Sequence, residues 1–302
     1  MFTTISQKTS FYTKEIKTII DSFNLLNPFN PSIYINEHTY YITVRAFGES
    51  MRLPFESYLI IYNRTTTSSS ILNLTTCMSK FGIAPTADPR FFIYKNEVWI
   101  SFNTGYKFYE NNDIYVVPIH KIQECKPWKC MLNGRRNTEK NWALFSDSNN
   151  QLCAIYSLSP LQIIEEERRD DIHHLIFFRK RTLDAKYLLP KRMRFTIGTQ
   201  LVKKGEDFYL IAHEKIFLIT KLIYFGRLVK LEERDNGFII KAISKKRLIH
   251  SYLSVFGRFQ KHNKSLISCT YFSGLCAVDD SLLVSYGIND LNYNIADIAS
   301  LL

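Results

Sequence analysis

The stretch Asp88-Pro-Arg-Phe-Phe-Ile-Tyr-Lys-Asn-Glu-Val-Trp-Ile-Ser-Phe102 contains the pattern that decides the fold. Residues 88–94 are a polar opening followed by apolar and aromatic side chains, and residues 97–102 are a second apolar run. Only Lys95 and Asn96 separate the two runs, and such spacing is typical of a β-hairpin. This stretch therefore predicts two antiparallel strands joined by a tight turn.

The same order of features recurs along the chain. A polar or small opening precedes a short apolar strand, a polar turn and a second strand rich in aromatic or β-branched residues. The openings fall at positions 30, 88, 140, 198 and 273, so successive copies begin 58, 52, 58 and 75 residues apart. A hairpin with two outer strands needs about 40–50 residues, which is the size of one blade of a β-propeller.

This repeat predicts an all-β fold, namely a five-bladed β-propeller with a short N-terminal helix. Residues 1–28 are expected to form a helical lead-in, because apolar residues from Ile16 to Phe23 follow one helix face before Pro28. Residues 29–302 would then form a single propeller domain. A β-sandwich that contains similar hairpins by coincidence is the alternative.

The composition is that of a globular protein, with 46% hydrophobic and 22% charged residues, which excludes a disordered or fibrous chain. No uninterrupted apolar run of about 18 residues occurs, so no membrane span is predicted. Residues 1–8 lack the apolar core of a signal peptide, and we therefore expect a cytoplasmic protein. The six cysteines lack zinc-site spacing, so we expect reduced thiols, no metal site and no cofactor.

The net charge of +11 is concentrated in basic runs at residues 179–194 and 241–247, while an acidic run occupies 165–171. Such runs are usually solvated loops, although basic ones can attract nucleic acid, anionic lipid or phosphorylated glycans. No zinc finger, RRM-type aromatic motif or Gly-rich phosphate loop accompanies them. No nucleic-acid partner is therefore expected.

A propeller would bring the openings of all copies together, because its inner strands line a central channel and their starting ends meet at one mouth. The openings would then surround a pocket, with the far ends of the second strands beside them. The openings carry Asn30, Asp88, Lys140, Asn141, Thr199 and Ser273, and the second-strand ends carry Arg45, Asn103, His213, Tyr286 and Asp290.

The run Asp88-Pro89-Arg90, with the apolar strand and the aromatic second strand after it, resembles the five-bladed propellers of glycoside hydrolase family 130. That family comprises β-mannoside phosphorylases and some β-1,2-mannosidases, and related β-1,2-mannosyltransferases share its fold. The ending from Phe272 to Asp290 also resembles the family's last blade. The resemblance spans residues 28–298.

The resemblance implies inverting glycosyl transfer, in which one carboxylate protonates the leaving oxygen or takes the acceptor's proton in the synthetic direction. Asp88 is the only carboxylate that opens a hairpin and is the first catalytic candidate. Asp290 is the second. The alternatives are that Asp88 caps its hairpin and that Asp290 is a turn residue.

The expected partners are a carbohydrate substrate and an anionic sugar donor (sugar nucleotide or sugar phosphate) or inorganic phosphate. Arg45, Arg90 and Lys140 stand in the repeat where cations would bind phosphate oxygens. An inter-blade ion pair is the alternative for Arg90, and a solvated charge is the alternative for Arg45.

His213 is the one histidine among the residues expected around the pocket. It would bind a sugar hydroxyl or a phosphate group, and the alternative is that it is a buried core residue. Trp142 and Tyr286 would stack on a sugar face, with plain packing as the alternative. The other predicted substrate-binding residues are Asn30, Asn103, Asn141, Thr199 and Ser273.

Members of the family usually carry a glutamate before Asp-Pro-Arg, but this chain has Ala87. Glu165, Glu166 and Glu167 lie in a charge run rather than at an opening, so the glutamates that activate water in the hydrolases have no counterpart here. The sequence thus favours a glycosyltransferase or phosphorylase acting on a β-linked, mannose-like sugar. The alternatives are a non-catalytic glycan-binding propeller and a β-glycoside hydrolase.

Overall fold

The computed structural model describes residues 1–48, 55–105, 111–136, 138–170, 173–182, 194–218, 221–234, 237–256 and 266–302. These residues are mostly strands. Most of the strands pair antiparallel with near neighbours in the chain and form successive meanders, and three parallel pairings among the described residues join strands that are further apart in the sequence. The all-β class is therefore confirmed. No helix in the described ranges is long and apolar enough to span a membrane.

The meanders are named here by their order in the chain. The first contains β2 (Phe29–Ile35), β3 (Thr39–Phe47), β4 (Phe55–Asn63) and β5 (Ser68–Asn73); the second contains β6 (Ala87–Tyr94), β7 (Glu97–Asn103), β8 (Ile114–Pro118) and β9 (Trp128–Leu132); the third contains β10 (Ala143–Ser146), β11 (Leu152–Leu158), β12 (Leu161–Arg169) and β13 (His174–Thr182). The fourth contains β14 (Arg194–Ile197), β15 (Val202–Lys204), β16 (Asp207–Leu218), β17 (Lys221–Arg234) and β18 (Gly237–Ile243), and the fifth contains β20 (Leu266–Val278), β21 (Ser281–Ile288) and β22 (Asn292–Asp297).

Several shorter elements lie outside the meanders. They are β1 (Phe2–Thr4), α1 (Phe11–Asp21), α2 (Leu74–Ser79), the 3-10 turn η1 (Ile119–Lys121), β19 (Arg247–Ile249), α3 (Tyr252–Phe256) and the 3-10 turn η2 (Ala299–Leu301).

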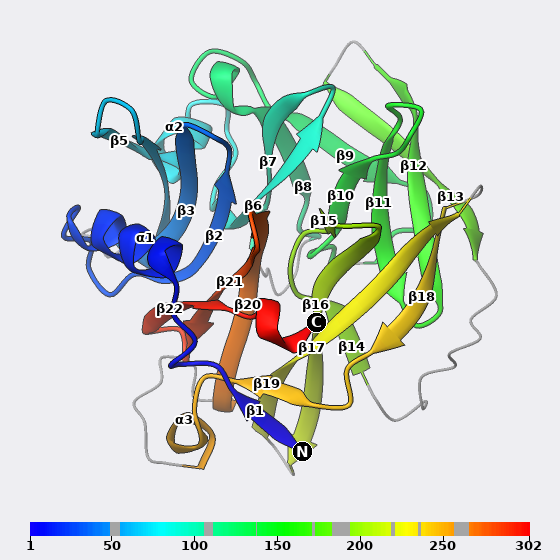
Figure 1. The fold of residues 1–302 in the computed structure, drawn as a ribbon. Helices are drawn as coiled ribbons and strands as arrows, with labels where there is room; N and C mark the ends of the chain where they lie inside the picture. Colours follow the sequence, from blue (N-terminus) through cyan, green and yellow to red (C-terminus); the bar gives the residue numbers. More distant parts are fainter. Residues whose placement is uncertain are drawn as a thin grey trace.

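Figure 1 shows the meanders following one another around a common centre, from blue through green to red. The innermost strands are β2, β6, β10, β15 and β20: β2 packs against β6 and β20, β10 packs against β6, and β15 packs against β20. The hydrophobic core is divided into layers between successive meanders, and one further layer joins the first meander to the fifth. Such a closed arrangement is propeller-like.

The hairpins predicted from the repeat are present, and four of them have the expected inner strand. The fourth differs, because its inner strand stops at Ile197 and restarts at Val202. Both Gly198 N and Thr199 N donate to Ile211 O, and Thr199 Oγ1 accepts from Ile211 N, so this segment bends across its partner strand instead of pairing in register.

Two local expectations were wrong. The helix is confined to Phe11–Asp21, because Asn24 and Asn27 adopt left-handed backbone and the preceding β1 pairs with β19 instead. The acidic run is not a solvated loop: Glu165–Arg169 belongs to β12, where buried Glu166 pairs with Arg169 at 2.5 Å. Most of the basic run at 179–194 lies outside the described residues.

Candidate functional site

A central polar cluster forms where the inner strands begin, and each meander contributes at least one side chain to it. Its members, which lie far apart in the sequence, are linked by the hydrogen bonds, ion pair and ring contact described below. The cluster consists of Arg45, Asp88, Arg90, Asn141, His213 and Tyr271.

The openings of the first three meanders share one backbone feature. Asn30, Asp88 and Asn141 have φ values of +50°, +48° and +63°, a left-handed region that Asn and Asp tolerate better than most residues. At Asn30 and Asp88 the strand register also shifts, between Phe29 and Ser32 and between Ala87 and Arg90. This shift explains why the repeat places a short polar residue at these openings.

Asp88 is paired with Arg45, whose Nη1 lies 3.0 Å from Asp88 Oδ1, and both side chains are at least 85% buried. Burial opposes ionisation of the carboxyl, but Arg45, Arg90, Lys140 and a hydrogen bond from Tyr271 outweigh it. These groups hold the pKa of Asp88 below its usual value. Asp88 is therefore a carboxylate at neutral pH.

Asn141 connects three meanders. Its Oδ1 accepts a hydrogen bond from Arg90 Nη2 at 2.8 Å and lies 3.3 Å from the Tyr271 hydroxyl, which also donates to Asp88 Oδ2 at 3.2 Å. Arg90 is 3% exposed, and its Nε and Nη1 find no hydrogen-bond acceptor among the described residues. Two buried guanidinium donors are thus available to an anion.

His213 is fully buried beside Tyr271, with the ring centroids 4.5 Å apart. Its Nε2 accepts a hydrogen bond from the backbone N–H of Phe272 at 3.0 Å. Burial and the charges of Arg90 and Lys215 hold the pKa of His213 well below its usual value. The imidazole is therefore neutral, and its Nδ1 has no hydrogen-bond partner in the described part of the chain.

Lys140 and Asp290 were also predicted to lie around the pocket. Lys140 is exposed, although its charge acts on Asp88 and His213. Asp290 follows β21 and has a φ of +56°. Burial, then Cys269 and then the charge of Asp290 raise the pKa of Tyr224 to about 12.

Several predicted binding residues make hydrogen bonds to the protein itself. Asn103 bonds Ala87 O and Gly105 N, Thr199 bonds Ile211 N and Gln200 O, and Ser273 donates to Pro31 O. Asn30 is 3% exposed and lies against Gly287, where a Cβ would collide with its amide.

The two aromatic residues predicted to stack on a sugar are both buried. Tyr286 has no exposed surface and packs on Phe272, with its hydroxyl 3.1 Å from His250 Nδ1. Trp142 is 4% exposed and donates from Nε1 to the buried carboxylate of Glu139 at 3.0 Å. Glu139 also accepts from Tyr156 and from Arg136 N, so it anchors the segment that leads to Asn141.

Sequence reasoning missed Tyr271, which links Asp88 to Asn141. Tyr271 lies two residues before the predicted fifth opening, Ser273, in a part of β20 that the repeat does not include. The only local signal is its position directly before Phe272 in an aromatic pair.

No protein-family model matches the chain, and no curated protein sequence matches it. Solved structures do match. A GDP-mannose-dependent mannosyltransferase from Leishmania mexicana is 13% identical, with 94% of each chain covered and a TM-score of 0.55. A mannose phosphorylase from the same organism, solved with a phosphate ion, is 12% identical over 96% of this chain and 94% of the other, with a TM-score of 0.54.

A structure from the GH130 family of mannoside phosphorylases, which contains glycoside hydrolases targeting β-1,2-mannosidic linkages in Candida mannan, also matches. It is 10% identical, with 89% of this chain and 83% of the other covered and a TM-score of 0.54. The resemblance to the fold of these carbohydrate-active enzymes, expected from the sequence, is therefore confirmed. At this level of identity the likeness concerns the fold.

Proposed function

We propose that the five meanders are the blades of a single five-bladed propeller over residues 29–302, preceded by a lead-in at residues 1–28. The core supports this count, because five of the six hydrophobic clusters of the described residues each join one meander to the next around the centre. The central polar cluster then lies at the mouth of the channel.

The proposed function is that of a carbohydrate-active enzyme that catalyses inverting transfer of a β-linked, mannose-like sugar. The observation that carries this proposal is the buried Asp88 carboxylate, which lies beside two guanidinium groups whose remaining N–H donors have no partner among the described residues. A sugar phosphate or sugar nucleotide offers phosphate oxygens that match such donors. The fold shared with phosphorylases and a mannosyltransferase agrees with this chemistry.

The ionised state of Asp88 favours the synthetic direction. A carboxylate with a lowered pKa is a poor general acid but can accept the proton of an acceptor hydroxyl as the new glycosidic bond forms. Arg90 would stabilise the negative charge on the departing phosphate, and so would Arg45 through its Nε, which has no partner in the described part of the chain. Lys140 at the rim would attract the anionic donor. Asp290 remains the second predicted catalytic carboxylate.

A donor screen tests this function. Purified protein is incubated with GDP-mannose, other sugar nucleotides and mannose 1-phosphate, each with mannose and mannobiose acceptors, and products are identified by mass spectrometry. We expect turnover with at least one donor and a loss of roughly 10²–10⁴-fold in Asp88→Asn. Asp207→Asn is the matched control, because Asp207 is also ion-paired and has a lowered pKa but lies outside the cluster. Equal turnover in both variants would refute the catalytic role of Asp88.

A non-catalytic glycan-binding propeller is the second candidate. It is favoured by Ala87, which is buried where related enzymes carry a glutamate, and by the closed ion pair between Asp88 and Arg45. For a glycan-binding protein, we expect calorimetry to detect binding of mannosides, and we expect no turnover of any donor. Loss of that binding in Arg90→Lys, with Asp207→Asn unchanged, would place the glycan at the cluster.

A further inference from the structure

A pocket with a volume of about 320 Å³ lies where the N-terminal strand β1 meets the strands β17 and β19 and the turn η2. Figure 1 labels these three strands, and η2 is the red segment that precedes the C-terminus. Each element contributes at least one side chain to the pocket, for example Thr3 from β1 and Leu301 from η2. None of the described residues that line it belongs to the central polar cluster.

Leucines form the apolar part of this pocket. Leu228 and Leu248 are buried and belong to the hydrophobic cluster between the fourth and fifth meanders. Leu301 is half-buried and packs on the same cluster, whereas Leu302 is exposed. We call these four residues the leucine floor. Because part of its surface is open to solvent, covering it with an alkyl chain would be favourable.

Cationic side chains stand at the rim of the same pocket. Lys245 and Lys246 line it and are exposed, so a ligand can reach them, and neither forms an ion pair with another described residue. Lys8 adds a third ammonium group, because its Nζ donates to Oγ of Ser300, a lining residue, at 2.8 Å. No aspartate or glutamate is among the described lining residues. The rim should therefore attract an anion.

Hydrogen bonds hold the loop that carries the two lysines. Ser244 N donates to Leu228 O at 2.8 Å, and Arg227 Nη1 donates to Ser244 O at 2.6 Å. Lys246 N donates to Ser244 Oγ at 3.2 Å. The backbone of Lys245 and Lys246 is thus fixed beside the leucine floor, so a ligand would not have to order this loop when it binds.

We propose that this pocket binds an amphiphilic anion, namely an alkyl chain that ends in a carboxylate. The chain lies on the leucine floor, and the two carboxylate oxygens face the ammonium groups of Lys245 and Lys246. Ser300 Oγ can donate to the same carboxylate while it accepts from Lys8. A pocket that combines apolar surface with a few polar groups is typical of small-molecule sites. This binding does not depend on the proposed transfer reaction.

Three probes test the combination of charge and alkyl chain in the unmodified protein. NMR titration measures the binding of octanoate, of 1-octanol, which keeps the chain without the charge, and of acetate, which keeps the charge without the chain. We expect octanoate to bind about tenfold more tightly than 1-octanol, because each exposed ion pair adds modestly to the affinity. Acetate should bind more weakly still, because it covers no leucine surface. Octanoate that binds no more tightly than either other probe, or not at all at millimolar concentration, would overturn the proposal.

A double variant tests the location. Lys245→Met combined with Lys246→Met should lower the affinity for octanoate to that for 1-octanol. Lys80→Met combined with Lys121→Met is the matched control, because it removes the same charge at two exposed lysines, at the end of α2 and in η1, that do not line the pocket. Circular dichroism checks that both double variants are folded. Equal weakening in both would assign the effect to the net charge, and unchanged binding in the first would place octanoate elsewhere, so either result would refute the proposal. The three-probe comparison decides if the first variant fails to fold.

Discussion

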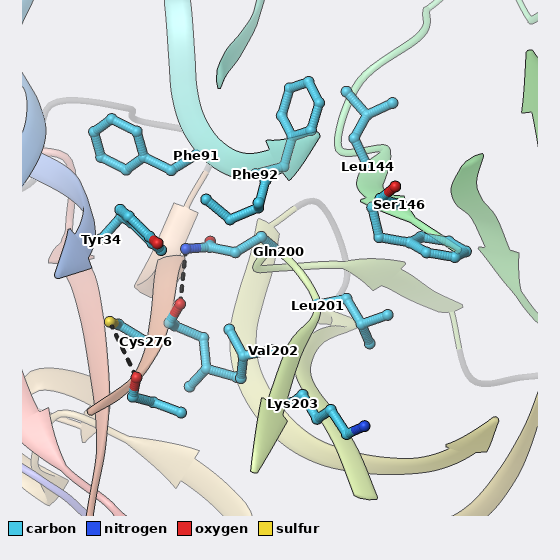
Figure 2. Close-up of a pocket in the computed structure, with 14 residues that line it drawn as sticks. Tyr34, Phe91, Phe92, Leu144, Ser146, Gln200, Leu201, Val202, Lys203 and Cys276 are labelled. Atoms are coloured by element: carbon cyan, nitrogen blue, oxygen red, sulfur yellow. Dashed lines mark hydrogen bonds between the residues drawn. The ribbon is translucent and has the colours of Figure 1, made fainter. Parts of the chain in front are cut away.

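The two ends of the inner strands form a contrast within one scaffold. Where the strands begin, the centre holds Asp88, Arg45 and Arg90, which are buried and charged. A few residues further along, Phe92 in β6 and Leu144 in β10 line a mainly apolar cavity of about 330 Å³ (Figure 2), in which Lys203 is the one charged side chain among the described lining residues. A single backbone arrangement thus supports both environments, because each strand changes from polar to apolar side chains along its length.

The contrast between the two ends arises from the local backbone. At the polar end, residues with left-handed backbone and shifts in strand register interrupt the regular strand pairing, so that polar groups there form other hydrogen bonds. The apolar ends are regular hairpins. We therefore expect substitutions at the polar end to act through charge and hydrogen bonding, and those at the apolar end to act through packing.

The largest effect is expected for Arg45→Met. Removing the cation leaves the buried Asp88 carboxylate without its ion-pair partner, which should lower the free energy of unfolding by about 3 kcal/mol. Urea denaturation measures this loss, and adding Asp88→Asn should recover part of it. Lys241→Met is the control, because Lys241 pairs with Asp207 on the surface, where solvent screens the interaction, and its loss should be clearly smaller. Equal losses would contradict the proposed contrast.

The next largest loss of stability is expected for Gly274→Ala. A Cβ at Gly274 would meet Ser285 Oγ and lie 2.8 Å from the backbone Cα of Ser32, where the fifth meander touches the first. Overpacking of this kind costs about 1–3 kcal/mol. The urea midpoint reports the change, and an unchanged midpoint would show that the two meanders are not in tight contact.

The pH dependence of stability should depend on His213. Because burial and nearby cations lower the pKa of His213 in the folded state, the unfolded chain binds a proton there at about pH 6.5 and below, whereas the folded chain does not. Stability is therefore fully present above that pH and falls as the pH decreases, by up to about 1.4 kcal/mol per pH unit. His213→Gln should reduce this slope between pH 6.5 and 5. An identical slope in the variant would assign the proton uptake to other groups.

The smallest effect is expected for Ser146→Ala at the apolar end. Ser146 Oγ has no described partner, so its removal should change stability by less than about 0.5 kcal/mol. Ser285→Ala is the matched change at the polar end, where the hydroxyl donates to Pro31 O at 2.6 Å, and it should cost about 1 kcal/mol. Reversal of this order in urea denaturation would contradict the comparison.

The hairpins were predictable because alternating apolar residues and short polar turns are local signals, as residues 88–102 show. The repeat predicted that polar residues from separate hairpins meet at one centre. Five of the predicted residues do lie together there, namely Arg45, Asp88, Arg90, Asn141 and His213. Their proposed roles in transfer remain predictions.

The partnerships within the site were not predictable. Arg45 and Asp88 are 43 residues apart in the sequence, and Tyr271 and Asp88 are 183 residues apart. No local sequence pattern therefore indicates these contacts. The strand β1 was missed for a similar reason, because its three residues are held by backbone pairing with residues 247–249 rather than by any periodicity.

That pairing has a consequence for how the molecule assembles. Phe2–Thr4 lie beside Arg247–Ile249, and Asp297 N donates to Lys8 O, so this early segment depends on partners that are synthesised much later. The N-terminal segment must remain unpaired while more than two hundred residues are synthesised, and closure comes after translation of the fifth meander. Contacts of such long sequence separation fold slowly, so ring closure should be the late step of folding.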